Sequence, residues 1–433
     1  MIYRLKVKIK KMNKRLLLIC LLLATTFYNI QAQEKCYTAI RRAKIVTEKP
    51  ELKTLFDKKE QVLQQILVEK SYQKRSKIVV PVVVHVVYKL EEENISDEQV
   101  HSQIQVLNED FGFTNKNKLD ASHAFYKYCA TSGIEFKLAN IDPSGNPTSG
   151  ITHTKTSKDF WKEEEFEDVK FTDSEGVNNW DPTSYLNIWV ANLDDSSDVL
   201  GFAIFPDELS KYPEYDGLVI RHEAFGTIGT AGKNGYGFAN LGRTATHEIG
   251  HWLNLKHIWG DAVCGNDFVA DTEPADSSNS DCPKFPHHPK NSCGSSENGE
   301  MFMNYMDYTS DECMNMFTIG QIERMKAALS TYRSKIMTSK GYYTATLVEN
   351  DLTNYLEVYP NPSTGTINLH ITNDLGLNAS IALVDIVGNT VKTFGKTTNN
   401  MLLNCEELPN GVYFIQLQNA EFNTSLKLIL NHE

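Results

Sequence analysis

The sequence predicts an α/β domain over residues 76–340, followed by a small all-β domain over residues 355–433. An apolar, β-branched run at 78–88 is typical of a strand that is buried on both faces. Segments with helical periodicity and further strand-like segments follow it, which favours an α/β architecture. Beyond residue 355, short alternating segments are separated by Gly, Asn and Pro, which indicates a β-sandwich.

The first 32 residues are typical of a signal peptide. A basic stretch precedes the apolar run 16–24, and Ala32 ends a suitable cleavage site. The apolar run is too short to cross a bilayer, so we expect no transmembrane span in the mature form. Export also allows the cysteines to pair as disulfides.

Residues 33–75 are expected to be a pro-segment. They are rich in charge, and an apolar stripe within 51–70 predicts a helix. A basic, polar stretch at 73–77 ends the segment, and such stretches are sensitive to proteases.

Within the α/β domain, the strand at 78–88 contains Pro81, which we expect to mark the true start of the strand. His85 is expected to be a hydrogen-bonded residue of the sheet. Ser96 and Gln99 have the spacing of a capping box, which predicts the start of a helix. Further strands are predicted at 134–139, 186–191, 201–205 and 217–220.

The stretch His247-Glu248-Ile249-Gly250-His251 indicates the chemistry. Residues four apart on a helix lie on the same face, so His247 and His251 can bind one metal ion. Two imidazoles and an adjacent carboxylate are the ligands and the general base of a zinc hydrolase. The alternative is a helix with incidental histidines, and the residues that follow argue against it.

His257 is the predicted third ligand. Six residues beyond His251, it would lie on the wrong face of an unbroken helix, so the helix must end between them. Asn254 stands where this end is required, and Asn is second only to Gly in adopting the left-handed conformation that ends helices. A zinc peptidase whose third ligand is a downstream glutamate is the alternative.

These motifs, together with Asn304-Tyr305-Met306-Asp307-Tyr308, resemble the metzincin signature and its Met-turn. The flanking residues 242–246 and 258–261 resemble the pappalysin family, with Asn254 in place of the family's usual Gly. The resemblance covers most of residues 77–333. It implies a metzincin-type α/β domain with a twisted mixed sheet, a zinc helix and an irregular C-terminal subdomain.

The resemblance also implies roles for individual residues. Glu248 is the expected catalytic base, and Tyr308 is expected to stabilise the oxyanion. Met306 should lie beneath the metal site. Asp311 matches the acidic base of a primed-side pocket that favours Arg or Lys just after the scissile bond, although an exposed loop acid is the alternative. An extended substrate is expected to add to an edge strand that contains Gly201, Phe202 and Ala203.

Four cysteines cluster after the metal motif in a stretch rich in Ser, Asn, Asp and Pro. Such clustering indicates disulfides, and four cysteines allow three connectivities. Zinc binding by these cysteines is the alternative, but no pair has the close C-x-x-C spacing. The resemblance to pappalysins favours the pairs Cys264–Cys293 and Cys282–Cys313.

Cys36 lies in Lys35-Cys36-Tyr37-Thr38, which resembles a Cys-Gly-Thr-like stretch near the start of some family members. A thiolate is a good zinc ligand, so Cys36 is expected to occupy the open zinc position and to keep the enzyme latent. An unpaired or incidentally buried cysteine is the alternative.

Asp, Glu and Thr side chains, which carry oxygen atoms, cluster near residue 270. Clusters of oxygen ligands of this kind bind hard cations. The resemblance implies calcium as a second cofactor, with Asp267 and Thr272 as the best matches to the family's ligands. A solvated acidic loop is the alternative.

Residues 341–354 are a predicted linker, and residues 355–433 resemble the C-terminal sorting domain of type IX secretion cargo. This resemblance implies the type IX secretion machinery as a partner. It also implies export through the periplasm to a secreted or cell-surface location. A carbohydrate- or protein-binding module is the competing interpretation.

The expected function is that of a secreted zinc endopeptidase, made as a latent zymogen, that hydrolyses protein or peptide substrates. The net charge of −12 argues against a nucleic-acid partner. A surface adhesin built on an inactive protease scaffold is the alternative, and the intact set of Glu248 and three histidines argues against it.

Overall fold

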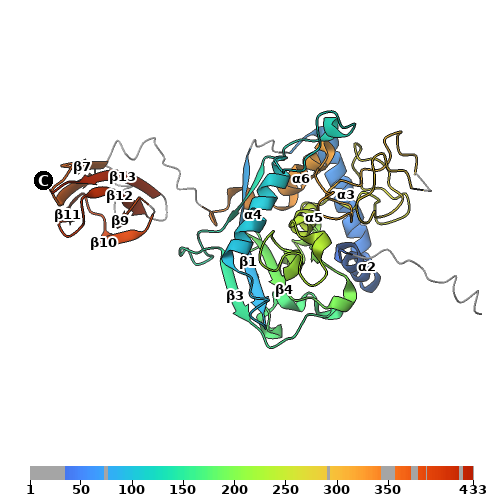
Figure 1. The fold of residues 1–433 in the computed structure, drawn as a ribbon, viewed down its shortest axis with the longest axis horizontal. Helices are drawn as coiled ribbons and strands as arrows, with labels where there is room; N and C mark the ends of the chain where they lie inside the picture. The colour runs from blue at the N-terminus through green and yellow to red at the C-terminus, as the bar shows by residue number, and fades with distance from the viewer. Residues whose placement is uncertain are drawn as a thin grey trace, which may run out of the picture. The chain divides into compact units, whose positions relative to one another are not determined.

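The computed structural model describes residues 35–72, 77–289, 293–342, 356–371, 379–386, 388–418 and 423–432 (Figure 1). The predicted signal peptide and most of the predicted linker lie outside the described residues. The chain divides into two compact units, residues 1–342 and 343–433.

A six-stranded, mixed sheet forms the centre of the first unit. Its strand order is β2-β1-β4-β6-β5, and β3 also pairs with β1. All neighbours are parallel except β5 and β6, so β5 forms an antiparallel edge. The strands are β1 (Ile78–Tyr88), β2 (Ile134–Leu138), β3 (Ile151–Lys155), β4 (Leu186–Ala191), β5 (Gly201–Ala203) and β6 (Leu218–Arg221).

β1 begins at Ile78 rather than at Pro81, so the predicted start is wrong. The Ile78 N–H donates toward β2, to the carbonyl of Gly133. The alternation along a strand therefore turns the nitrogen of Pro81 toward the other edge, where β4 pairs with β1 only from Val82 onward. The missing N–H of proline thus interrupts no ladder, which is why the strand continues through it.

His85 is a satisfied sheet residue, as expected. It is fully buried, and its two ring nitrogens lie 2.9 Å from Thr152 Oγ1 and 3.1 Å from Asn187 Oδ1. Strand β3, which contributes Thr152, was not predicted, because only its first residue is buried and the four that follow are polar.

Helix α4 (Asp97–Phe111) begins at the predicted cap, where Ser96 Oγ accepts a hydrogen bond from the Gln99 N–H. The capping box is only half formed, because the Gln99 side chain donates to the carbonyl of Phe225 at 2.8 Å instead. Near the other end of α4, the buried Asp110 accepts hydrogen bonds from Thr246 and Tyr305. These bonds join the helix that carries the histidines, α5 (Arg243–Trp252), to the Met-turn.

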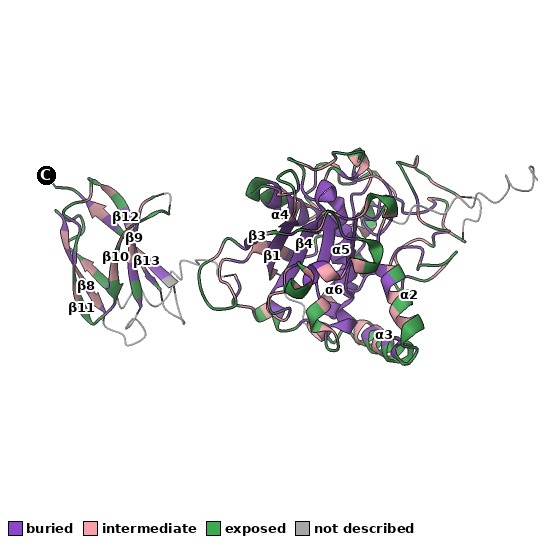
Figure 2. Cartoon of the chain, turned by 90° about the horizontal axis from the view of Figure 1, so that it is seen from below, coloured by how far each residue is buried: buried purple, intermediate pink, exposed green. Residues whose placement is uncertain are grey.

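The C-terminal end of α5 is held by a buried ion pair. Asp216 accepts two hydrogen bonds from Arg333 and a third from the indole N–H of Trp252. Both charged side chains are fully buried, so each depends on the other for its stabilisation. As Figure 2 shows, α5 and strands β1 and β4 form the buried interior of this unit.

Two helices precede the sheet, α2 (Thr38–Glu48) and α3 (Glu51–Glu69). Leu63 of α3 packs against Ala327 of the last helix, α6 (Ile319–Tyr332). Thr318 and Gln321 form a complete capping box at the start of α6.

The segment between α5 and α6 is irregular and carries both disulfides. Cys264 pairs with Cys293, and Cys282 pairs with Cys313, which are the pairs that the family resemblance implied.

The second unit consists of two antiparallel sheets that share one hydrophobic core. The larger sheet has the order β10-β9-β12-β13 and the smaller has β11-β8-β7, as expected for a sandwich. The strands are β7 (Leu356–Tyr359), β8 (Thr366–Ile371), β9 (Ser380–Val384), β10 (Thr390–Lys396), β11 (Asn400–Asn404), β12 (Gly411–Gln418) and β13 (Asn423–Leu430).

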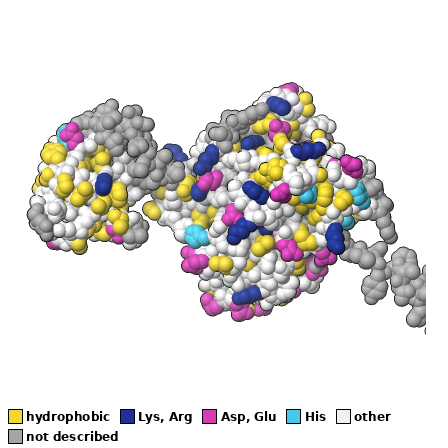
Figure 3. Space-filling view, turned by 45° about the horizontal axis from the view of Figure 1, so that its top comes forward, with side chains coloured by type: hydrophobic (Ala, Val, Ile, Leu, Met, Phe, Trp, Pro, Cys, Tyr) yellow, Lys and Arg dark blue, Asp and Glu magenta, His cyan; other side chains and the backbone are white. Residues whose placement is uncertain are grey.

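On the face that Figure 3 shows, acidic and basic side chains of the described residues intermix on the first unit, and no basic patch gathers there. Within the described ranges, no helix has both the length and the apolar character that crossing a membrane requires.

Candidate active site

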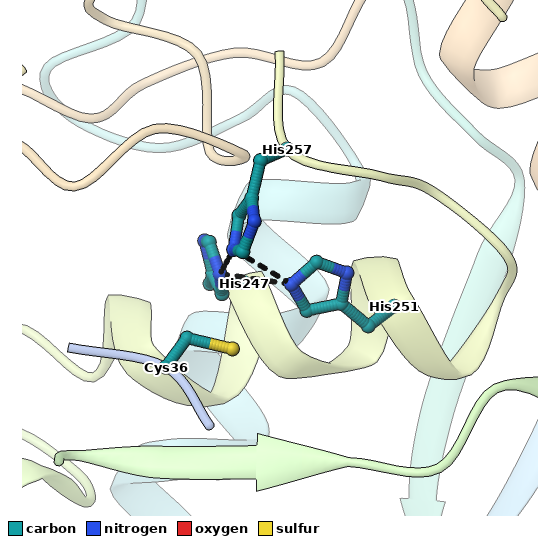
Figure 4. A group of neighbouring side chains, drawn as sticks. All are labelled: Cys36, His247, His251 and His257. Atoms are coloured by element: carbon teal, nitrogen blue, oxygen red, sulfur yellow. Dashed lines mark hydrogen bonds between the residues drawn. The ribbon is translucent and has the colours of Figure 1, made fainter. Parts of the chain in front are cut away.

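Helix α5 brings the predicted residues together. His247 and His251 lie one turn apart on the same face, and Glu248 lies beside them. His257 reaches the same point from the segment after the helix, so that the three rings converge (Figure 4). All four side chains are buried.

Each histidine is oriented by an oxygen at its Nδ1. The partner of His247 is the carbonyl of Tyr305, at 2.7 Å, and that of His251 is the carbonyl of Leu255, at 2.8 Å. His257 Nδ1 contacts the Asp261 carboxylate. Since these oxygens accept hydrogen bonds, the proton lies on Nδ1, and each Nε2 presents a lone pair to the common centre.

The spacing of the three Nε2 atoms fits a zinc ion. The distances between them are 3.1, 3.1 and 3.3 Å. Ligands about 2.0–2.1 Å from a tetrahedral zinc would lie about 3.3 Å apart. Cys36 adds a fourth donor, since its sulfur and the three nitrogens all lie within 4.8 Å of one another.

Burial controls the protonation of these groups. It lowers the pKa of His247 to about 3 and that of His251 well below its ordinary value, with further lowering by His257. Both imidazoles are therefore neutral at physiological pH, which is the form that binds metal. Burial also raises the pKa of Glu248 to about 8.

Asn254 makes the predicted turn. Its φ is 74°, in the left-handed region, and the preceding helix ends at Trp252. The Asn254 carbonyl also accepts a hydrogen bond of 2.7 Å from Arg324 Nε, and its side-chain oxygen accepts one of 2.5 Å from Arg324 Nη2. A glycine could make the turn but not the second contact, which is a physical reason for Asn at this position.

Met306 and Tyr308 lie where the Met-turn predicts. Met306 is fully buried against Gly250, where a Cβ atom would lie 2.3 Å from its sulfur. Gly250 therefore leaves the space that the methionine fills beneath the two helical histidines. The ring of Tyr308 lies 4.9 Å from that of His257, and its hydroxyl donates to the carbonyl of Cys36 at 3.4 Å.

The N-terminal segment occupies the cleft along β5. The Leu200 N–H donates to the carbonyl of Lys35, and the Tyr37 N–H donates to that of Gly201. Cys36 and Gly201 form a parallel bridge, so the segment extends the sheet at its open edge. The predicted substrate strand is thus present, and the chain's own N-terminal segment pairs with it.

The same segment covers Glu248. The carboxylate oxygen Oε2 accepts a hydrogen bond of 3.0 Å from Thr38 Oγ1 and a longer one of 3.5 Å from Cys36 Sγ. Its other oxygen is buried and has no hydrogen-bond partner among the described residues. An unpartnered carboxylate oxygen beside three converging nitrogens fits a site that binds a metal and a water molecule.

Asp311 lies at the base of a pocket that Lys35 enters. Its carboxylate accepts hydrogen bonds from the Leu241 and Arg243 N–H groups, and burial raises its pKa to about 6. The Lys35 ammonium donates to the carbonyl of Tyr308 at 2.6 Å in the same pocket. A basic side chain therefore fills this pocket in the structure.

The acidic residues near position 270 serve separate purposes. Thr272 Oγ1 donates to Asp267 at 2.8 Å, so the two expected calcium ligands are in contact. Asp271 instead accepts hydrogen bonds from Thr318 and Gly320 at the start of α6. Calcium at Asp267 and Thr272 stays a prediction.

Two residues of the site were missed in the sequence. Asp261 orients His257, and its spacing of four residues from that histidine was the available signal. Thr38 contacts Glu248 from the N-terminal segment. It belongs to the Cys-Gly-Thr-like stretch, but that resemblance gave it no role, because the contact joins positions 210 residues apart.

Comparison with known proteins gives two family matches. Residues 171–330 match the family described as pregnancy-associated plasma protein-A, and residues 357–431 match the secretion system C-terminal sorting domain.

Curated relatives and a solved structure are similar to the first unit. An extracellular metalloprotease of Sordaria macrospora is 37% identical over 34% of this chain and 50% of its own length. One of Arthroderma otae is 30% identical over 56% of this chain and 74% of its own length. The matched region thus spans about half the length of the first of these relatives. A promirolysin mutant of Tannerella forsythia has 42% identity and a TM-score of 0.63, and the match covers 70% of this chain and 97% of that chain.

Proposed function

The chain belongs to the pregnancy-associated plasma protein-A, or pappalysin, family of metalloproteases and carries a type IX sorting domain. We propose that it is a secreted zinc endopeptidase, made as a zymogen, that cleaves peptide bonds before Arg or Lys. The convergence of the three Nε2 atoms beside Glu248 carries this proposal. Peptide cleavage by the processed enzyme and by its Glu248→Gln variant tests it.

In this proposal, His247, His251 and His257 hold the zinc. When bound, zinc supplies Lewis acidity toward the scissile carbonyl and lowers the pKa of water. Glu248 accepts the proton of the attacking water and passes it to the leaving amine. The hydroxyl of Tyr308 already donates to a carbonyl in the cleft, that of Cys36, and so is placed to donate to the oxyanion of a substrate.

The pro-segment maintains latency in three ways. Cys36 supplies a thiol at the metal position, Thr38 contacts Glu248, and the backbone of 35–37 pairs with β5. We propose processing by removal of residues 1–32 as a signal peptide and of residues 33–75 as the pro-segment. Residues 76–340 then form the protease domain, and residues 355–433 form the sorting domain.

The contents of the Asp311 pocket support the preference for Arg or Lys. The Lys35 ammonium lies in this pocket. Burial lowers the pKa of Lys35, but the nearby Asp311 carboxylate acts in the opposite direction and favours the charged form. A substrate residue just after the scissile bond would replace Lys35 once the pro-segment leaves.

Replacing Asp311 with Asn should reduce the ratio of kcat/KM for Arg over Leu after the scissile bond by about tenfold, since a charge-assisted contact is lost. Paired peptides that differ only at that residue measure the ratio. Because Asp311 also binds two backbone N–H groups, cleavage of both peptides will fall, and only the ratio reports on specificity. An unchanged ratio would mean that residues other than Asp311 set the preference for Arg.

A further inference from the structure

Glu208 is a buried carboxylate whose described partners come from the pro-segment. It ends the short 3₁₀ helix Pro206–Glu208, which two residues separate from β5, and its side chain is fully buried. Arg41 donates to its Oε2 at 2.7 Å, and Arg42 donates to its Oε1 at 2.6 Å. Burial alone would raise the pKa of Glu208, but these two guanidinium groups outweigh it and hold the pKa below its ordinary value.

The catalytic unit surrounds these arginines with further groups that favour cations. Arg41 also donates to Glu167 at 2.5 Å, and Arg42 pairs with Asp207. The guanidinium of Arg42 lies 3.3 Å from the ring centroid of Phe56 in the same segment and 5.2 Å from that of Phe205, both within cation–π distance. The Phe205 ring also lies 5.5 Å, between centroids, from the ring of His251.

Removal of the pro-segment takes both arginines away and leaves the acidic groups. Lys170 of the catalytic unit lies near Glu208, but its ammonium donates to the carbonyl of Tyr215 at 2.7 Å. A recessed carboxylate that has lost its charged partners is strongly stabilised when it binds a new cation. A cavity of about 550 Å³ lies beside this group, between the pro-segment helices and the catalytic unit, which lines it with Phe205, Asp207, Asp261 and Lys256 among others, so removal of the pro-segment would open this side of it.

The position of Glu208 and its acidic neighbours along the cleft follows from the path of the pro-segment. Lys35 lies on the Asp311 side of Cys36, whereas Arg41 lies on the opposite side. One extended step, from Cys36 to Tyr37, and one helical turn, from Tyr37 to Arg41, separate the two residues, which amounts to about 9 Å. An extended peptide covers about the same distance in three residues.

We propose that Phe205, Asp207 and Glu208 form a subsite in the processed enzyme that binds an arginine side chain of the substrate, about three residues before the scissile bond. This inference rests on the proposed endopeptidase function and adds a second basic specificity to it. The site favours arginine over lysine, because a planar guanidinium can stack on the Phe205 ring and bind a carboxylate through two N–H groups at once.

A set of peptides tests the subsite on the processed, zinc-loaded enzyme. All share Arg just after the scissile bond, and a single Arg, Lys or norleucine is placed two, three or four residues before it. We expect kcat/KM for Arg to exceed that for norleucine by about tenfold or more at one of these positions, with Lys between them. In the Glu208→Gln and Asp207→Asn variants, this ratio should fall to within about twofold.

Each ratio is taken within one protein, so it does not depend on how much of a variant folds or is secreted. Glu214→Gln, at an exposed glutamate that follows in the chain, is the matched control and should retain the wild-type ratio. Equal cleavage of all peptides by an active wild-type enzyme, or an Arg preference that both variants retain, would overturn the subsite alone. No cleavage of any peptide would overturn the proposed function and the subsite with it.

Discussion

Replacing Glu248 with Gln should lower kcat for peptide cleavage by roughly 10²–10⁴-fold, the usual contribution of a general base. The amide has nearly the same shape but cannot accept the proton of the attacking water. Glu248 is fully buried beside the three histidines, and one of its oxygens has no partner among the described residues. The measurement is single-turnover cleavage of an Arg-containing peptide by the processed enzyme.

The control for this variant is its zinc content, which should equal that of the wild type because Glu248 is not one of the converging donors. A variant that binds zinc normally and retains wild-type kcat would exclude Glu248 as the base. Loss of zinc together with activity would instead indicate a structural role for the carboxylate.

Replacing Cys36 with Ala should raise the activity of the unprocessed chain by at least about tenfold, since a metal–sulfur contact is worth more than the 1.4 kcal/mol that this factor represents. Residual latency is expected, because backbone pairing with β5 and the ion pairs of Arg41 and Arg42 remain. Initial rates on a short peptide, with the intact mass recorded for each sample, measure the effect before the pro-segment is lost.

Cys129→Ala is the matched control, because Cys129 is a free cysteine of the same unit that is not among the converging donors. It should remain as latent as the wild type. If Cys36→Ala were equally latent, strand pairing and the contact between Thr38 and Glu248 would be the source of latency rather than the thiol.

Much of the site could be predicted because it depends on local geometry. The pair His247 and His251 follows from the helical period, and the left-handed turn at Asn254 follows from the need to bring His257 back. The start of α4 at Ser96 and that of α6 at Thr318 follow from capping preferences, which are also local.

The features that could not be predicted depend on which distant segments meet. The strand at Pro81 was misjudged because its start depends on where β4 begins to pair with β1, more than one hundred residues later. The contacts of Arg41 and Arg42 with Glu208 likewise join the predicted pro-segment to the 3₁₀ helix that follows the edge strand. Charged residues on an amphipathic helix usually face solvent, so the sequence offered no reason to pair these.

The most direct test of the account is zinc binding by the full-length zymogen and by its His257→Ala variant under metal-limited conditions. Three histidines with converging Nε2 atoms predict one tightly bound zinc per chain. Loss of one ligand should weaken zinc binding by at least roughly 100-fold, more than the loss of an outer hydrogen bond. A His257→Ala protein with wild-type zinc affinity would contradict the three-histidine site and indicate a different third ligand.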